Sequence, residues 1–320
     1  MKAKTLSKGF KRGIIQARGL GDILIALPIA RHYFEQGEEI VWPICEEFYA
    51  SVKDSVDWVT WVPMKTDERG EFFLAQPLKI FKYHDVDPNK ALYLYHYLNT
   101  VPELTDPELF NILKFDQYKY WVSAVPFRMK WTLADCIARD PAREDRLRAA
   151  VGILDKKDRY AVTSLKGSNF NAQIPTGFLD PAVRVIDVDA NATDSIFDWI
   201  GVLEGAETIV CVDSAVANMV DQLCIDGPKL YWMRRSPWDL TPVLGSCWTM
   251  LPTNLPIKDP VRVDPAAEAL KKRQALQPQP VLQPKTAAQA NGGSQSELTS
   301  HVPFKAAGAI PTSFMSALKK

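Results

Sequence analysis

The sequence predicts an α/β protein made of two Rossmann-like domains and a disordered C-terminal tail. Apolar runs of strand length alternate with helical segments through two halves of similar size, a pattern typical of parallel sheets. In each half a predicted strand runs directly into a helix, at residues 19–22 and again at residues 213–215. Near residue 271 the composition changes and apolar residues become sparse, which indicates the end of the folded region.

Composition narrows the class of protein. The chain has 320 residues, of which 47% are apolar, and Lys+Arg and Asp+Glu balance at 38 each. This length allows two domains. The balanced charge argues against nucleic acid as the main partner, but it does not exclude a local basic groove. No apolar run of about 18 residues is present, so no transmembrane segment is expected. The basic N-terminus does not have the pattern of a secretory signal.

The five cysteines are widely spaced and form no Cys-x-x-Cys pair. Such spacing fits reduced thiols in the cytoplasm and predicts no zinc site. We therefore expect a cytoplasmic protein without a metal or a cofactor.

The first domain is expected to span residues 1–152. Its predicted strands are residues 13–17, 39–44, 58–62 and 91–98. Helices are predicted from residue 22 to 36, from 105 or 106 to 115, and over 134–152 with a break at Asp140-Pro141. We expect the aromatic run 118–127, which contains Pro126, to be irregular.

The second domain is expected to span residues 153–271, after a polar turn at 156–158. Its predicted strands are residues 160–165, 183–188, 207–212 and 229–233, and its helices are residues 194–203 and 215–223. Residues 272–320 are rich in Gln, Pro, Ala and Ser and cannot bury enough apolar surface to offset the cost of ordering. We expect them to form the disordered tail.

The run Arg18-Gly19-Leu20-Gly21-Asp22 joins the first predicted strand to its helix. Glycine lets the backbone approach a ligand, and a helix N-terminus presents free N–H groups, so Arg18, Gly19 and Gly21 are candidates for contacting an acceptor or a phosphate. Asp22 is either a functional carboxylate or only a helix N-cap. The third glycine of a dinucleotide fingerprint is missing, so NAD and FAD are not expected.

A second candidate site follows the strand at 207–212. Ser214 and the free N–H groups after it have the chemistry to hold a diphosphate, although Asp213 or Ser214 alone could be an N-cap. Lys166 and Ser168 lie in the loop after the strand at 160–165, where Lys166 either neutralises phosphate or is simply solvated. Arg234 ends the strand at 229–233 and can recognise phosphate.

The run Gly19–Pro28 resembles the N-terminal signature of heptosyltransferase-like glycosyltransferases, which have the GT-B fold of two facing Rossmann-like domains. The run from Gly205 to Leu223 resembles the donor site of the same family. The resemblance implies transfer of a sugar from a nucleotide-sugar donor to an acceptor hydroxyl, with inversion and without a metal. It implies that Asp22 is the general base.

The resemblance also implies a set of donor-binding residues in the second domain: Lys166, Ser168, Asp213, Ser214 and Asn218. Arg234 joins this set by its position at the end of a predicted strand, not by the resemblance. Ala215 stands where the family usually has glycine, and Asn218 stands where it usually has histidine. Because of these departures, the sequence does not identify the donor. It does not identify the acceptor either.

Two alternatives stay open. The first is a non-catalytic binding or assembly protein on a degenerate GT-B scaffold, because a fold alone does not confer an activity. The second is a metal-dependent enzyme, because the Asp-x-Asp runs at 85–87 and 187–189 carry the oxygen ligands that Mg²⁺ or Mn²⁺ prefers.

Overall fold

Two parallel β-sheets with associated helices make up the described part of the chain in the computed structural model. The structure describes residues 10–67, 70–96, 109, 112–155, 157–166, 171–234 and 241–252. All of these belong to one compact unit by their contacts, so the division predicted near residue 152 stays a prediction. The predicted tail, Ser168 and most of the helix predicted at 105–115 lie outside the described residues.

The first sheet has the strand order β3-β2-β1-β4, with all neighbours parallel. Its strands are β1 (Lys11–Ile15), β2 (Glu39–Cys45), β3 (Val59–Met64) and β4 (Leu92–Tyr93). The chain builds outward from β1 to β3 and then crosses back to place β4 on the other side of β1. The order therefore reverses between β1 and β4, and α/β proteins bind ligands at such a switch point, beyond the carboxyl ends of the strands.

Three α-helices connect these strands: α1 (Leu20–Glu35), α2 (Glu46–Lys53) and α3 (Ala75–Tyr83), with short 3₁₀ turns η1 (Glu71–Phe73) and η2 (Pro88–Lys90). Helix α1 begins after Gly19, whose φ of 85° is accessible to glycine at little cost. A β-carbon on Gly13 of β1 would lie 2.5 Å from the ring of Phe81 on α3. The close packing of α3 on the sheet therefore requires glycine at that position.

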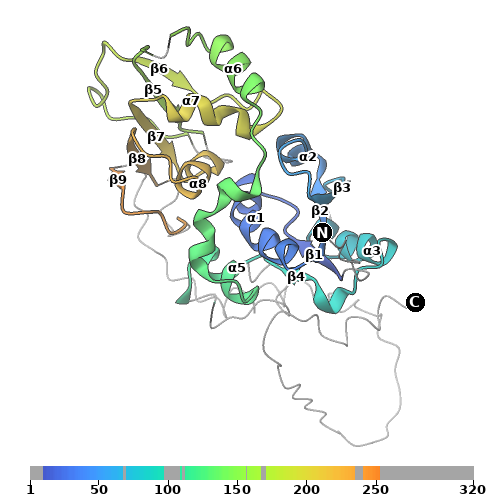
Figure 1. Ribbon diagram of the computed structural model, residues 1–320. Coiled ribbons are helices and arrows are strands. Elements are labelled where there is room, and N and C mark those ends of the chain that lie inside the picture. Colours follow the sequence, from blue (N-terminus) through green and yellow to red (C-terminus); the bar gives the residue numbers. More distant parts are fainter. Residues whose placement is uncertain are drawn as a thin grey trace, which may run out of the picture. The chain divides into compact units, whose positions relative to one another are not determined.

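The second sheet has the order β6-β5-β7-β8-β9 and is also parallel throughout. Its strands are β5 (Tyr160–Ser164), β6 (Arg184–Asp187), β7 (Thr208–Val212), β8 (Lys229–Met233) and β9 (Trp248–Leu251). The switch point lies between β5 and β7. Helical segments η6 (Ile196–Trp199), α7 (Ile200–Glu204) and α8 (Ala215–Gln222) connect the strands, and the predicted α/β fold with two parallel sheets is confirmed (Figure 1).

The chain between the sheets forms α5 (Phe115–Val122), η4 (Phe127–Trp131), η5 (Leu133–Cys136) and α6 (Pro141–Ala150). The prediction that residues 118–127 are irregular is wrong, because residues 118–122 complete α5. Tyr118 and Tyr120 are buried there, so tertiary packing outweighs their modest helix propensity. The break predicted at Asp140-Pro141 is confirmed, since the Asp140 carboxylate caps α6 at the backbone N–H of Ala142, 3.0 Å away.

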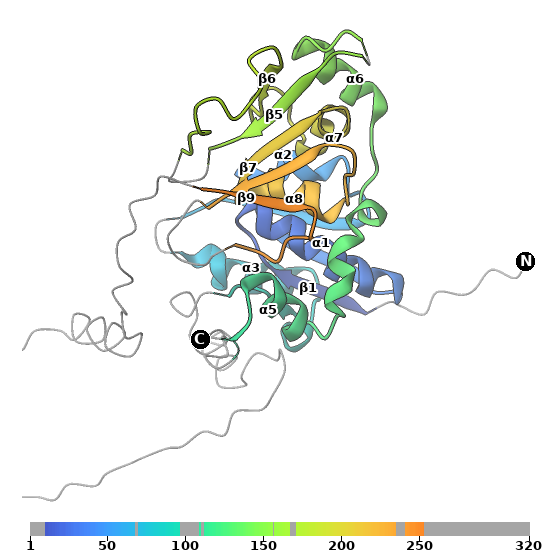
Figure 2. The same ribbon diagram turned by 90° about the vertical axis from the view of Figure 1, so that its left-hand side faces the viewer.

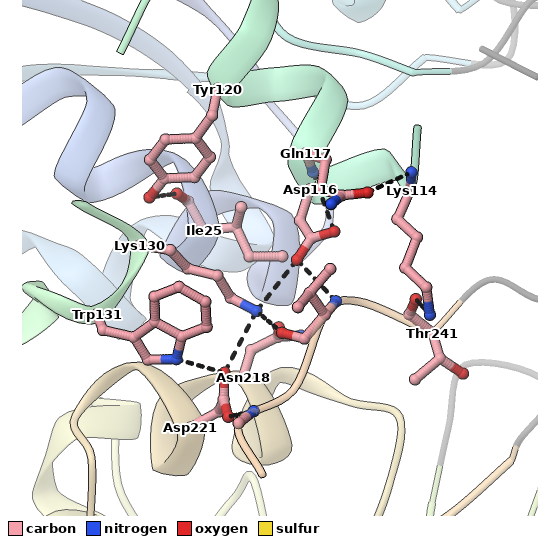
Figure 3. Close-up of polar contacts among 12 residues, drawn as sticks. Ile25, Lys114, Asp116, Gln117, Tyr120, Lys130, Trp131, Asn218, Asp221 and Thr241 are labelled. Atoms are coloured by element: carbon pink, nitrogen blue, oxygen red, sulfur yellow. Dashed lines mark hydrogen bonds and ion pairs between the residues drawn. The ribbon is translucent and has the colours of Figure 1, made fainter. Parts of the chain in front are cut away.

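A buried lysine ties α5, α8 and the segment of residues 241–245 together (Figure 3). Lys130 Nζ lies 3.1 Å from Asp116 Oδ2 on α5 and 3.3 Å from Asp221 Oδ2 on α8, and it also donates to the carbonyl of Val243. Asp116 accepts from the Val243 N–H at 2.9 Å, and Asp221 accepts from the Gly245 N–H at 2.7 Å. We call this set of contacts the Lys130 network.

Removing the ammonium should expose how much the fold depends on the Lys130 network. We expect Lys130→Met to lower the free energy of unfolding by about 3–5 kcal/mol, because two buried carboxylates lose their shared cation. Urea unfolding followed by circular dichroism measures this loss. The matched control is Lys82→Ala on the exposed side of α3, which should change stability by no more than about 0.5 kcal/mol. Equal losses in both variants would contradict this role.

The five cysteines are all described, and their burial predicts their reactivity. Cys45, Cys136 and Cys211 are buried, whereas Cys224 and Cys247 are exposed. Burial raises the pKa of Cys45 to about 11 and raises the pKa of Cys136 and Cys211 as well, so these thiols carry little thiolate at pH 8. We expect Ellman's reagent to modify two thiols rapidly in the native protein and all five in denaturant. Rapid modification of a third native thiol would show that a buried cysteine is accessible.

Candidate functional site

Asp22 lies in the first turn of α1, directly beyond the carboxyl end of β1 and beside the switch point of the first sheet. Its side chain is 21% exposed. Arg18 precedes the turn and is about half exposed, with Nε 3.9 Å from Glu47 Oε1. Gly19 and Gly21 flank the start of the helix, so the five-residue run forms the rim of this sheet edge, as the sequence predicts.

One carboxylate oxygen of Asp22 faces a buried lysine. Lys119 Nζ lies 3.0 Å from Asp22 Oδ1, and the Lys119 side chain is 1% exposed. The same ammonium donates to Gln16 Oε1 at 2.6 Å and to the Leu94 carbonyl at 2.7 Å. Burial lowers the pKa of Lys119, and the Asp22 carboxylate opposes this shift.

The second predicted site lies at the switch point of the other sheet. Asp213 and Ser214 follow β7 directly, and Ser214 is the N-cap of α8, accepting from the Ala217 N–H at 3.5 Å. Asn218 Nδ2 donates to the Ser214 carbonyl at 3.0 Å. Asn218 Oδ1 is buried and has no hydrogen-bond partner among the residues that the structure describes.

The two basic candidates follow strands on either side of β7. Lys166 comes shortly after β5 and is exposed, and it forms an isolated antiparallel bridge with Asn171. Arg234 follows β8 and is also exposed. Because β5, β7 and β8 run parallel, Lys166, Asp213, Ser214 and Arg234 all leave the same edge of the sheet.

The starts of α1 and α8 are in direct contact. A β-carbon on Gly21 would lie 3.1 Å from Asn218 Nδ2 and 3.5 Å from the Cα of Ala215. The two helices lie side by side in both views (Figures 1 and 2). The structure thus brings Gly21 together with Asn218 and Ala215 from the other predicted site.

Lys119 and the Lys130 network were not found by the sequence analysis. Lysine is mostly exposed in proteins, and nothing local to Lys119 or Lys130 marks either side chain as buried. Their partners are far away in the chain: 103 residues separate Lys119 from Gln16. The one local signal is the spacing of Asp116 and Lys119, which share a face of α5.

The Asp-x-Asp runs have local partners in the structure. Asp87 accepts from the Asn89 N–H at 3.0 Å, Asp189 accepts from the Asn191 N–H at 2.9 Å, and Asp187 accepts from the Thr163 hydroxyl. Within the described ranges, no group of three or more His, Cys, Asp or Glu side chains has the arrangement of a metal site. None of the helices that the structure describes has the length and apolar content needed to cross a membrane.

The fold is that of an α/β protein with two parallel sheets. Polar residues lie at the switch point of each sheet, Asp22 at the first and Ser214 at the second. No protein-family model matches the chain, and no curated protein matches it.

Several glycosyltransferases of solved structure are similar to this chain. A family 9 glycosyl transferase from Veillonella parvula is 9% identical and has a TM-score of 0.46, covering 76% of this chain and 86% of its own. The E. coli heptosyltransferase WaaC with ADP-2-deoxy-2-fluoro heptose is 11% identical and has a TM-score of 0.44, covering 82% of this chain and 100% of its own. The iron-containing dodecameric glycosyltransferase TibC from enterotoxigenic E. coli is 10% identical and has a TM-score of 0.42, covering 76% and 63%.

Proposed function

We propose that this chain is an inverting, metal-independent glycosyltransferase of the GT-B type. It would move a sugar from a nucleotide-sugar donor to an acceptor hydroxyl, with Asp22 as the general base. The observation that carries the proposal is the position of Asp22 at the start of α1, beside one switch point, and of Ser214 at the start of α8, beside the other. The two helix starts are in contact, so the edge of the first sheet that carries Asp22 lies next to the edge of the second sheet where α8 begins. The start of α8 has the chemistry to bind phosphate.

The donor side is supported by the start of α8. Free N–H groups and the positive end of a helix dipole favour a diphosphate, and Ser214 adds a hydroxyl there. Lys166 and Arg234 leave the same edge of the sheet and supply positive charge. These groups can balance the charge of a leaving nucleoside diphosphate without a metal ion.

The acceptor side is supported by Asp22. Its Oδ1 atom is buried against Lys119, while the side chain keeps 21% of its surface exposed. In a single displacement, the acceptor oxygen attacks the anomeric carbon as the bond to the diphosphate breaks. The acceptor proton passes to the Asp22 carboxylate, and inversion at the anomeric carbon follows from the single displacement.

A second candidate function is a non-catalytic binding or assembly protein on the same scaffold. The specific observation in its favour is that Asn218 is 3% exposed and packs against the turn at Gly21. Helix α1 packs against the start of α8 and leaves Ser214 and Ala215 only partly exposed. An enzyme of the proposed type would gain room for its donor by separating these two helix ends.

Removal of the Asp22 carboxylate tests the enzyme and its base together. We expect wild-type protein to turn over at least one nucleotide sugar from a broad panel, and Asp22→Ala to lower kcat by about 10²- to 10⁴-fold through loss of the general base. Product release is measured as free nucleoside diphosphate, with and without EDTA. Activity unchanged by EDTA supports the metal-independent form of the proposal.

Asp57→Asn is the matched control for this test. Asp57 is exposed and precedes β3, at the opposite end of the sheet from Asp22, so this variant should keep wild-type kcat. No turnover of any donor by wild type would favour the non-catalytic candidate. Full activity in Asp22→Ala would show that another group takes the proton.

Lys166 should contribute to binding the leaving group. We expect Lys166→Ala to weaken binding of ADP, UDP, GDP or CDP, whichever binds the wild type best, by about 10-fold or more, because a charge-assisted contact to phosphate is lost. Isothermal titration calorimetry measures the change. Lys229→Ala is the control, since Lys229 is exposed at the start of β8, away from the carboxyl ends of the strands. Equal affinity in the Lys166 and Lys229 variants would remove Lys166 from the donor site.

A further inference from the structure

Lys119 is a fully buried cation next to the proposed base, and the mechanism above gives it no role. Its side chain is 1% exposed, and it comes from α5, which is neither of the two helices whose ends form the site. An isolated buried ammonium is costly, so its partners must all be in place for the site to be stable. Those partners determine what Lys119 can do.

The ammonium donates two hydrogen bonds and forms an ion pair with Asp22. Gln16 Oε1 lies at 2.6 Å, the Leu94 carbonyl at 2.7 Å and Asp22 Oδ1 at 3.0 Å. Gln16 is itself held, because its Nε2 donates to the Arg18 carbonyl at 2.8 Å. Leu94 is held by its N–H, which donates to the Ile15 carbonyl at 3.1 Å.

These contacts anchor the ammonium to the ends of β1 and β4, on either side of the switch point. Gln16 follows β1 and Leu94 follows β4, and neither strand can shift without breaking the sheet between them. The position of Lys119 Nζ relative to the sheet is therefore fixed, next to the first turn of α1. The charged groups facing it are Asp22 from α1 and Asp116 from its own helix.

The Asp22 carboxylate is consequently held at Oδ1, whereas Oδ2 lies toward the turn at Gly19, 2.7 Å from where a β-carbon on Gly19 would stand. Oδ1 is buried against Lys119, so the exposed part of this side chain does not include that atom. A half-turn of the carboxylate only exchanges its two equivalent oxygens, whereas a smaller rotation moves the facing oxygen away from the ammonium and leaves a buried charge without its counter-charge. The ion pair thus selects one orientation of the carboxylate.

We propose that Lys119 is a positioning residue for Asp22, holding Oδ1 so that Oδ2 is the oxygen that receives the acceptor proton. This inference rests on the proposed role of Asp22 as base. Lys119 does not touch the substrate and acts only through Asp22. A small misplacement of a catalytic group can cost about 10²-fold in rate, so the effect of losing Lys119 should fall on kcat.

The test is a double-mutant cycle with Lys119→Met and Asp22→Asn, assayed on the nucleotide sugar that the wild type turns over. We expect Lys119→Met to lower kcat by about 10- to 100-fold and to change the donor KM by less than about 3-fold. In the Asp22→Asn background, the same substitution should change kcat by less than about 3-fold, because its effect passes through the carboxylate. Equal fold losses in both backgrounds would overturn the proposal.

Crystal structures of the wild type and Lys119→Met provide a readout that needs no activity. We expect the Asp22 carboxylate to leave its wild-type orientation, or to occupy more than one, when the ammonium is absent. A carboxylate that keeps its single orientation would overturn the positioning role. Failure of the wild type on every donor would instead overturn the proposed function, so the two failures are distinguishable.

Gln16→Met covers the case in which Lys119→Met does not fold. This variant leaves Lys119 and Asp22 intact but removes the shortest of the three contacts that anchor the ammonium. It should lower kcat by a smaller factor than Lys119→Met, again with KM unchanged and without effect in the Asp22→Asn background. Urea unfolding of each variant verifies the fold, and an unchanged kcat in folded Gln16→Met would contradict the anchoring step.

Discussion

The arrangement of this protein depends on one buried cation, Lys130, which holds two carboxylates from helices on different parts of the chain. A buried ion pair need not stabilise a fold more than apolar residues would, but once it is built, removing one member is costly. Asp116 belongs to α5 and Asp221 to α8, so the Lys130 network fixes these two helices against the same segment of residues 241–245. The helix that carries Lys119 and the helix that Ser214 caps are therefore positioned by the same set of contacts.

The candidate site inherits its geometry from this arrangement. Helix α5 brings Lys119 to Asp22, three residues from the carboxylate that binds Lys130. Helix α8 brings Ala215 and Asn218 to Gly21. A buried lysine thus contacts each side of the proposed site: Lys119 pairs with Asp22, and Lys130 pairs with Asp221 of α8. Each lysine is held by atoms from more than one element of secondary structure. The acceptors of Lys119 directly follow two paired strands, which limits how far the ammonium can move.

The contact between α1 and α8 is the point at which the two candidate functions differ. A glycosyltransferase must admit a donor to the start of α8, whereas a binding protein can keep that helix end covered. Ala215 and Asn218, the two positions that depart from the resembling family, are the residues of α8 that meet Gly21. The departures from the family and the contact between the two helices therefore involve the same few atoms.

The sequence by itself determined the elements whose signals are local. The strand, glycine turn and helix at residues 11–35 and the break at Asp140-Pro141 follow from short-range chemistry, and the structure has each of them. The sequence left Asp213 and Ser214 as alternative caps, and the structure shows that Ser214 caps α8. The alternation of strands and helices likewise predicted two parallel sheets. Tertiary structure alone decided that the run at 118–122 is helical and that Lys119 and Lys130 are buried, because their partners come from segments that are distant in sequence. Lys130 and Val243, for example, are 113 residues apart. A lysine surrounded by polar and aromatic neighbours in sequence carries no local sign of such partners, so its burial becomes visible only when the chain has folded.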